Sequence, residues 1–213
     1  DNEGNIYLSG NYRTKLFLKA ADGTTVTLTA KNNKDFGGDP QQSVGDLYLI
    51  KLDKDGYYVS SLTSESSCQA AYMDRIVYHD GKIYANGRVA GDGSEYLLGG
   101  KAINAATKHE TPYIASINTS DLSVNYVTTL GWAEGNSKWG IHNKGIQYED
   151  GCIWTTGGLQ GTLASVPNKT GLYRGFAIRI NPDNGEVLNT MMFNISGISE
   201  CFGVYVNSST VYA

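Results

Sequence analysis

The sequence predicts an all-β fold, because strand-like phrases recur along it and no window carries a sustained helical period. Residues 76–87 consist of an apolar run, an Asp-Gly turn and a second alternating run, which is the pattern of a β-hairpin. The same pattern returns at residues 146–157 and again at 204–213. A content of 26 glycines and 15 tyrosines suits many turns and half-buried strands. We therefore expect helix to be nearly absent.

A second phrase alternates with these hairpins and adds two strands to each repeat. It consists of a strand, a tight turn and another alternating run, and it occurs at residues 46–63, 113–130 and 175–193. Four antiparallel strands that recur in this way are the pattern of a β-propeller blade. Measured between the equivalent residues Ile6, Ile83, Ile153 and Val211, the repeats are 77, 70 and 58 positions long.

The repeats divide the chain into about three blades and the first hairpin of a fourth. With the strands of a blade lettered A to D from the centre outward, residues 1–63 supply strands B to D of blade 1. Blade 2 is expected at 73–130, blade 3 at 143–193 and the start of blade 4 at 202–213. The last strand duplicates the role of the first, so one ring cannot use both. Because propellers normally close with four or more blades, we expect an arc of a larger propeller. Copies of the chain that assemble into a ring are the alternative.

Turns and cysteines give no sign of a metal or cofactor. The acidic turns at 53–56 and 181–186 begin as calcium loops do, but neither reaches the distant glutamate that such a loop needs. Asp-Gly and Asn-Gly are also what ordinary hairpin turns require. The three cysteines, Cys68, Cys152 and Cys201, lack zinc-site spacing and are expected to be free and mostly buried. We expect neither a metal nor a cofactor.

Several phrases resemble the bacterial β-propeller repeat family called SBBP. They are residues 1–10, Phe36-Gly-Gly38 followed by residues 45–56, and Leu130-Gly131. The resemblance implies a propeller in an extracellular, periplasmic or cell-surface protein, and it brings no catalytic residue. Kelch-like repeats are the runner-up, because Gly157-Gly158 closes a strand as a kelch double glycine would, although the regular kelch tryptophan is missing.

Charge and hydropathy exclude two classes of partner. A net charge of −4 and a pI near 5.3 argue against a phosphate-binding surface, so we expect no nucleic acid. No apolar run approaches the length needed to span a bilayer, so we expect no membrane span.

The long connections between strands indicate where a ligand would bind. The A-to-B and C-to-D turns are tight, whereas the B-to-C and D-to-A connections, which share the opposite face, are long. Loops on one face of a rigid scaffold usually carry function. One such connection, residues 131–143, contains two tryptophans, a carboxylate and a histidine. The candidate ligand-binding residues are Trp132, Glu134, Trp139 and His142, with Tyr72, Arg88, Glu95 and Glu200 as weaker ones.

Aromatic rings beside polar groups suit a carbohydrate or a protein ligand. We therefore expect a non-enzymatic binding or surface-interaction protein with no catalytic residue. A hydrolase or lyase at the channel mouth is one alternative, and a structural spacer in a larger secreted protein is the other. Trp154, which lies within a strand, is expected to pack in the core, and residues 17–28 are expected to form an extra hairpin.

Overall fold

The computed structural model describes residues 1–31, 45–64, 70–90, 95–104, 110–133, 141–163, 166–167, 172–193, 197–207 and 210–213. Within these ranges every regular element is a β-strand and every sheet is antiparallel. The predicted all-β class is therefore confirmed.

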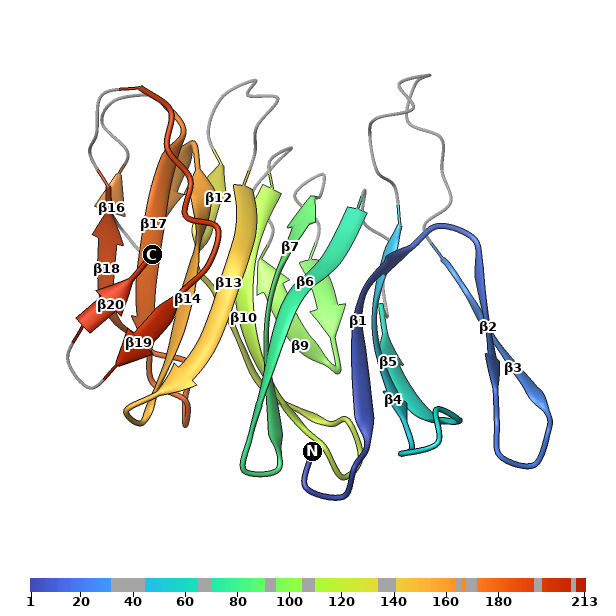
Figure 1. The fold of residues 1–213 in the computed structure, drawn as a ribbon. Helices are drawn as coiled ribbons and strands as arrows, with labels where there is room; N and C mark the ends of the chain where they lie inside the picture. The colour runs from blue at the N-terminus through green and yellow to red at the C-terminus, as the bar shows by residue number, and fades with distance from the viewer. Residues whose placement is uncertain are drawn as a thin grey trace.

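Three larger sheets stand side by side, with their tight turns at one end (Figure 1). The first has the order β1 (Ile6–Tyr12), β4 (Asp46–Leu52), β5 (Tyr58–Thr63). The second has the order β6 (Ala70–His79), β7 (Lys82–Ala90), β10 (Glu110–Asn118), β11 (Val124–Thr129). The third has the order β13 (Ile141–Glu149), β14 (Cys152–Leu159), β17 (Arg174–Ile180), β18 (Val187–Met192). In each sheet the order of the strands follows their order along the chain.

Smaller hairpins accompany the three sheets. The predicted hairpin near residues 17–28 is present as β2 (Lys15–Lys19) and β3 (Thr25–Thr29). The predicted hairpin at 204–213 is present as β19 (Tyr205–Asn207) and β20 (Thr210–Tyr212).

The connections predicted as loops contain further strands. One holds a hairpin of β8 (Glu95–Leu98) and β9 (Lys101–Asn104). Others contribute a small sheet of β12 (Gly131–Ala133), β15 (Gly161–Leu163) and β16 (Val166–Pro167). The prediction of plain loops was wrong there, because a connection that is partly buried must pair its backbone groups.

The three sheets share one register in the strand pairs β1–β4, β7–β10 and β14–β17. Aliphatic residues face each other in the pairs Ile6–Leu52, Ile83–Ile117 and Ile153–Ile180. Four residues further along, a glycine faces an aromatic residue in the pairs Gly10–Tyr48, Gly87–Tyr113 and Gly157–Phe176. In each of these pairs the ring lies close against the glycine. The sequence repeat therefore corresponds to a repeated strand pairing.

Asp-Gly turns close the hairpins as predicted. Asp80 and Gly81 have φ values of 43° and 74°, and Asp150 and Gly151 have φ values of 51° and 68°. Positive φ at both central residues is the type I′ geometry that matches the twist of a two-residue hairpin.

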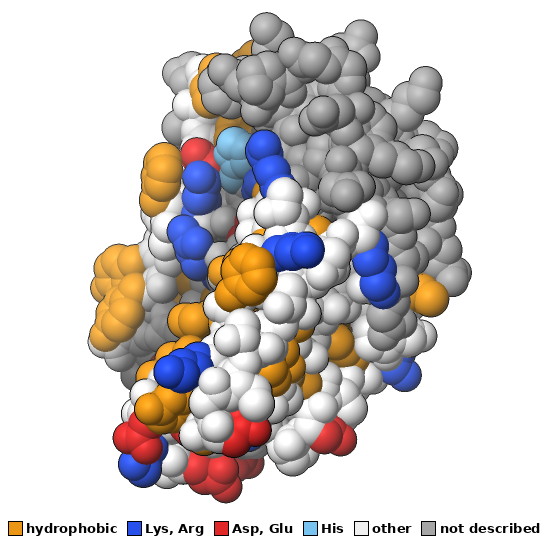
Figure 2. Space-filling view, turned by 90° about the vertical axis from the view of Figure 1, so that its right-hand side faces the viewer, with side chains coloured by type: hydrophobic (Ala, Val, Ile, Leu, Met, Phe, Trp, Pro, Cys, Tyr) orange, Lys and Arg blue, Asp and Glu red, His pale blue; other side chains and the backbone are white. Residues whose placement is uncertain are grey.

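The acidic turn at residues 53–56 is held by its own side chain. The Asp53 carboxylate accepts hydrogen bonds from the backbone N–H groups of Asp55 and Tyr57, both at 2.9 Å. Asn181 accepts one from Asp183 N–H in the turn at 181–186. These side chains stabilise their own turns by accepting backbone hydrogen bonds, as expected for ordinary hairpin turns. Acidic side chains gather at the lower end of the molecule in Figure 2.

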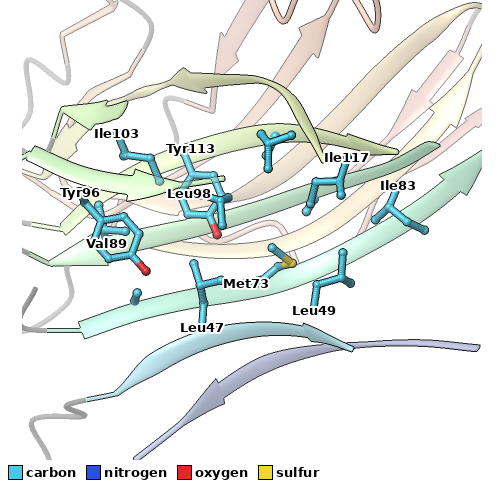
Figure 3. Packing of buried hydrophobic residues seen from close by; sticks show 14 of the residues in the cluster. Leu47, Leu49, Met73, Ile83, Val89, Tyr96, Leu98, Ile103, Tyr113 and Ile117 are labelled. Carbon is cyan, nitrogen blue, oxygen red and sulfur yellow. The ribbon is translucent and has the colours of Figure 1, made fainter. Parts of the chain in front are cut away.

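Each sheet has two faces that pack differently. We call the face that points toward the preceding sheet in the chain the upstream face, and the face that points toward the following sheet the downstream face. Ile83, Ala85 and Tyr113 on the upstream face of the second sheet pack against Leu47 and Leu49 of the first sheet (Figure 3). On its downstream face, Tyr84 and Ile114 pack against the third sheet, and the residues they join there are Ile153, Phe176 and Ile178. The middle sheet is therefore enclosed on both sides.

Trp154 and two of the cysteines can be placed in this arrangement. Trp154 lies on the downstream face of the third sheet and is half-buried, so it is less enclosed than a core residue. Arg179 lies over its ring at 6.0 Å from the ring centroid. Cys152 and Cys201 are free and buried, as predicted, and Cys68 lies outside the described residues.

Alkaline pH is expected to destabilise the packing between the second and third sheets. Burial, assisted by neighbouring Tyr148, raises the pKa of Tyr84 to about 12. An unfolded tyrosine titrates near 10, so the stabilisation is fully present below about pH 10 and is lost as the pH rises toward about 12. Urea unfolding at a series of pH values should show the midpoint falling above about pH 10. The midpoint of the Tyr84→Phe variant should fall less steeply with pH. An equal fall in both proteins would contradict the role of Tyr84 in this pH dependence.

Candidate functional site

Polar side chains gather at the strand ends opposite the tight turns. The strand β7 leaves its tight turn at residues 80–81 and runs to Ala90, so Arg88 lies near its far end. Arg88 pairs with Tyr72 of β6 on one side and with Pro112 of β10 on the other. Because neighbouring strands are antiparallel, Glu110 at the start of β10 lies at the same end.

Arg88 is the centre of a first group of side chains. Its Nε lies 3.1 Å from Glu110 Oε1, and its Nη1 lies 3.5 Å from Asp74 Oδ2. Nη1 donates to the Ile141 carbonyl at 3.2 Å, and the guanidinium lies 4.2 Å from the centroid of the Tyr72 ring. Burial alone would lower the pKa of Arg88, but the charges of Asp74 and Glu110 outweigh it and the pKa is raised.

The third sheet holds both carboxylates of this group. Ile141 N–H donates to Glu110 Oε2 at 2.8 Å. Asn143 Nδ2 donates to Asp74 Oδ2 at 3.2 Å and to the Gly87 carbonyl at 2.8 Å. We call Tyr72, Asp74, Arg88, Glu110 and Asn143 the Arg88 cluster. It joins the second sheet to the third where β13 meets β6 and β7.

A second group lies on the other side of β13. His142 Nδ1 lies 3.2 Å from Glu200 Oε1, and the Tyr173 hydroxyl donates to the same oxygen at 3.0 Å. Lys144 Nζ lies 3.6 Å from it. Burial and the Glu200 carboxylate raise the pKa of Tyr173. We call His142, Lys144, Tyr173 and Glu200 the Glu200 cluster.

A β-bulge in β6 and another in β13 each contribute one residue to a cluster. The register shifts between Met73 and Arg75 in β6, and between Asn143 and Gly145 in β13. The extra residues at these shifts are Asp74 and Lys144, one in each cluster. A bulge re-aims a side chain out of the strand alternation, and bulges are frequent next to functional sites. Tyr72 and His142 occupy equivalent positions, each two residues before its bulge residue.

The structure places four of the predicted residues in these clusters, namely Tyr72, Arg88, His142 and Glu200. Trp132 lies in β12, where it pairs with Thr162, but its side chain lies outside the described residues. Glu134 and Trp139 lie outside them altogether, and of Glu95 only the backbone, at the start of β8, is described.

The prediction of one continuous loop at 131–143 was wrong at both ends. Gly131–Ala133 forms β12 and Ile141 begins β13, so Trp132 and His142 are strand residues. The two strands join different sheets, which separates residues that the sequence had grouped.

Sequence reasoning ranked Tyr72, Arg88 and Glu200 low and missed five residues of the clusters. The missed residues are Asp74, Glu110, Asn143, Lys144 and Tyr173. One signal was present for Asp74, a carboxylate in a strand that is otherwise largely apolar. Glu110 and Asn143 carried no local signal, because the contacts that select them cross between sheets.

Each cluster mixes donors and acceptors that remain partly accessible. The exposed side-chain fractions are 16% for Arg88, 26% for Glu110, 32% for His142 and 17% for Glu200. Among the described residues, no group of three or more His, Cys, Asp or Glu side chains could hold a metal ion. No helix in the described part of the chain is long and apolar enough to cross a membrane.

Comparison with known proteins leaves the family open. A search of protein-family models finds none that matches the chain, and a search of curated proteins finds no match.

Proposed function

We propose that the chain is an arc of a β-propeller that binds a carbohydrate at the end carrying the Arg88 and Glu200 clusters, without catalysing a reaction. The common register of the three sheets and their face-to-face stacking support the propeller. The resemblance to SBBP repeats supports an extracellular, periplasmic or cell-surface location.

The observation that carries the binding proposal is the convergence of the two clusters at one strand end. Charged donors and acceptors lie there beside the half-buried ring of Tyr72, while the buried Tyr173 contributes its hydroxyl to Glu200. A sugar hydroxyl both donates and accepts hydrogen bonds, and a sugar ring packs on aromatic surfaces. A protein ligand remains the alternative partner for the same groups.

His142→Ala is expected to weaken glycan binding by about 1–3 kcal/mol, because the imidazole is the most exposed group of the Glu200 cluster. The measurement is calorimetric titration of the purified chain with the polysaccharide that binds best in a panel of soluble glycans. His79→Ala is the matched control, since His79 stacks on Tyr148 beside the tight turn at the opposite strand end. Trp139→Ala is expected to weaken binding by a similar amount.

Two results would contradict this proposal. One is that no glycan binds while a protein ligand does, which would favour the protein alternative. The other is equal binding by the His142→Ala and His79→Ala variants, which would leave the clusters with a structural role only.

A hydrolase or lyase is the second candidate, because the Glu200 cluster joins an imidazole, a carboxylate and a phenol by hydrogen bonds. Such groups can act as general acid and base. New reducing ends or new double bonds released from a bound polysaccharide by the wild-type chain, and not by His142→Ala, would establish this alternative.

A further inference from the structure

The upstream face of the first sheet is open at Ile6 and Leu8, although Tyr12 and Ile50 on the same face are buried. The equivalent positions in the other two sheets are buried. Ile6 and Leu8 are each 44% exposed. Their equivalents by register are Ile83 and Ala85 in the second sheet, at 1% and 0%, and Ile153 and Thr155 in the third, both at 0%. The first sheet thus presents the residues of an interface without the facing sheet.

The downstream face of the third sheet is also incompletely covered. Trp154 is half-buried there, while its equivalent Tyr84 is 3% exposed between the second and third sheets. All large exposed hydrophobic residues of the described chain lie toward its two ends, and none lies between residues 70 and 133. They are Ile6, Leu8, Phe17, Tyr57, Val59, Leu172, Leu188, Ile198, Phe202, Tyr205 and Tyr212. Figure 2 shows exposed hydrophobic side chains among Lys and Arg on the side that carries the first sheet.

The chain forms the same kind of interface twice, and each instance includes a hydrogen bond from the downstream face to the next sheet. Lys51 Nζ donates to the Thr119 carbonyl at 2.9 Å. The Tyr126 hydroxyl donates to the Pro182 carbonyl at 3.1 Å. Thr119 and Pro182 are equivalent residues, each two positions after the last isoleucine of its strand.

The two open faces carry the equivalents of these groups. On the third sheet, Arg179 corresponds to Lys51 and Asn189 corresponds to Tyr126. On the first sheet, Lys54 corresponds to Thr119 and Pro182. One molecule therefore presents both halves of an interface that it already forms internally.

We propose that a second copy of this chain covers these faces, with the downstream face of the third sheet in one copy packed on the upstream face of the first sheet in the next. This contact is heterologous, because different surfaces of the two copies meet. The far strand end of this downstream face also carries the Glu200 cluster. The tests below are made without a glycan, so their outcome is separate from that of the glycan titration.

The assembly also completes a four-stranded sheet. By the sequence repeat β20 corresponds to β1, and it pairs with β19 through three residues, whereas β1 pairs with β4 through seven. In the assembly β1 of the second copy replaces β20 as the neighbour of β19. The resulting order β19-β1-β4-β5 has the arrangement of the second and third sheets.

Cysteine cross-linking tests the orientation. The variants Asn189→Cys and Lys54→Cys place thiols at the positions equivalent to the Tyr126–Pro182 contact, and both native side chains are exposed. A short bis-maleimide should link the two variants when they are mixed. Either variant alone should give no more cross-linked dimer than the wild-type chain, which has only its native cysteines. Linking of one variant with itself as strongly as in the mixture would overturn the head-to-tail contact.

Sedimentation of the full 213-residue chain tests the self-association. The wild-type chain should associate with rising concentration, and Leu8→Lys should weaken this at least about tenfold, because it places an unpaired charge in the contact. Leu8→Ile, which keeps the apolar side chain, and Ser120→Lys, which adds the same charge at a remote turn, should associate as the wild type does. A wild-type chain that stays monomeric throughout, or a Leu8→Lys variant that associates equally well, would overturn the proposal and leave the open faces to a different partner.

Discussion

Replacing Arg88 by methionine is expected to destabilise the protein by about 3 kcal/mol, because the change leaves two half-buried carboxylates without their counter-charge. Asp74 and Glu110 keep only 14% and 26% of their side-chain surface exposed, and both lie within ion-pair distance of Arg88. Removing one partner of a buried ion pair costs about 3–5 kcal/mol, and the partial exposure of the carboxylates places this case at the lower end. Urea unfolding of the purified variant measures the change.

Two further variants separate the charge from the packing. The triple variant Arg88→Met, Asp74→Asn, Glu110→Gln removes the uncompensated charge and should recover most of the lost stability. Arg88→Lys should lose about 1–2 kcal/mol, since an ammonium cannot reproduce the fork that reaches two carboxylates and the Ile141 carbonyl. If Arg88→Met unfolds at the same urea concentration as the wild type, the Arg88 cluster does not join the two sheets.

Gly87→Ala is expected to destabilise the protein by about 3 kcal/mol, although its backbone conformation is open to alanine. The added methyl group would overlap the Tyr72 carbonyl oxygen and the Tyr113 ring. Tyr113 is fully buried and its hydroxyl donates to that same carbonyl at 2.8 Å, so neither neighbour can move without disturbing the other. The free energy of unfolding, measured in urea, should fall accordingly.

Gly10→Ala is the matched control, because Gly10 has the same place in the first sheet. Its added methyl group would meet only the Tyr48 ring, with the hydroxyl oxygen at 2.8 Å. The nearest atoms are the far end of one half-buried side chain and not backbone, so the loss should stay below about 1 kcal/mol. Equal losses in the two variants would show that the glycine matters for strand pairing alone and not for stacking.

The hairpins and their turns could be predicted from the sequence because the information is local. An Asp-Gly pair between two alternating runs selects a type I′ turn, and the φ values of Asp80 and Asp150 agree with it. The repeat also predicted which strands are neighbours, including the pairs β1–β4, β7–β10 and β14–β17 that long connections join. The hairpin of β8 and β9 did carry a turn signal, Gly99-Gly100, whose φ values of 54° and 71° fit a type I′ turn, but its strands are short and were missed. No Asp-Gly or Gly-Gly pair flanks β12.

The sequence by itself determined the all-β class, the repeated pairing of strands and the tight-turn end, all of which depend on residues a few positions apart. Only the tertiary structure decided the candidate site. Asp74, Arg88, Glu110 and Asn143 come from four strands, and they meet because two sheets stack and because bulges turn Asp74 and Lys144 out of their strands. Contacts across such distances in the sequence depend on register and stacking, and no local pattern of residue types encodes those.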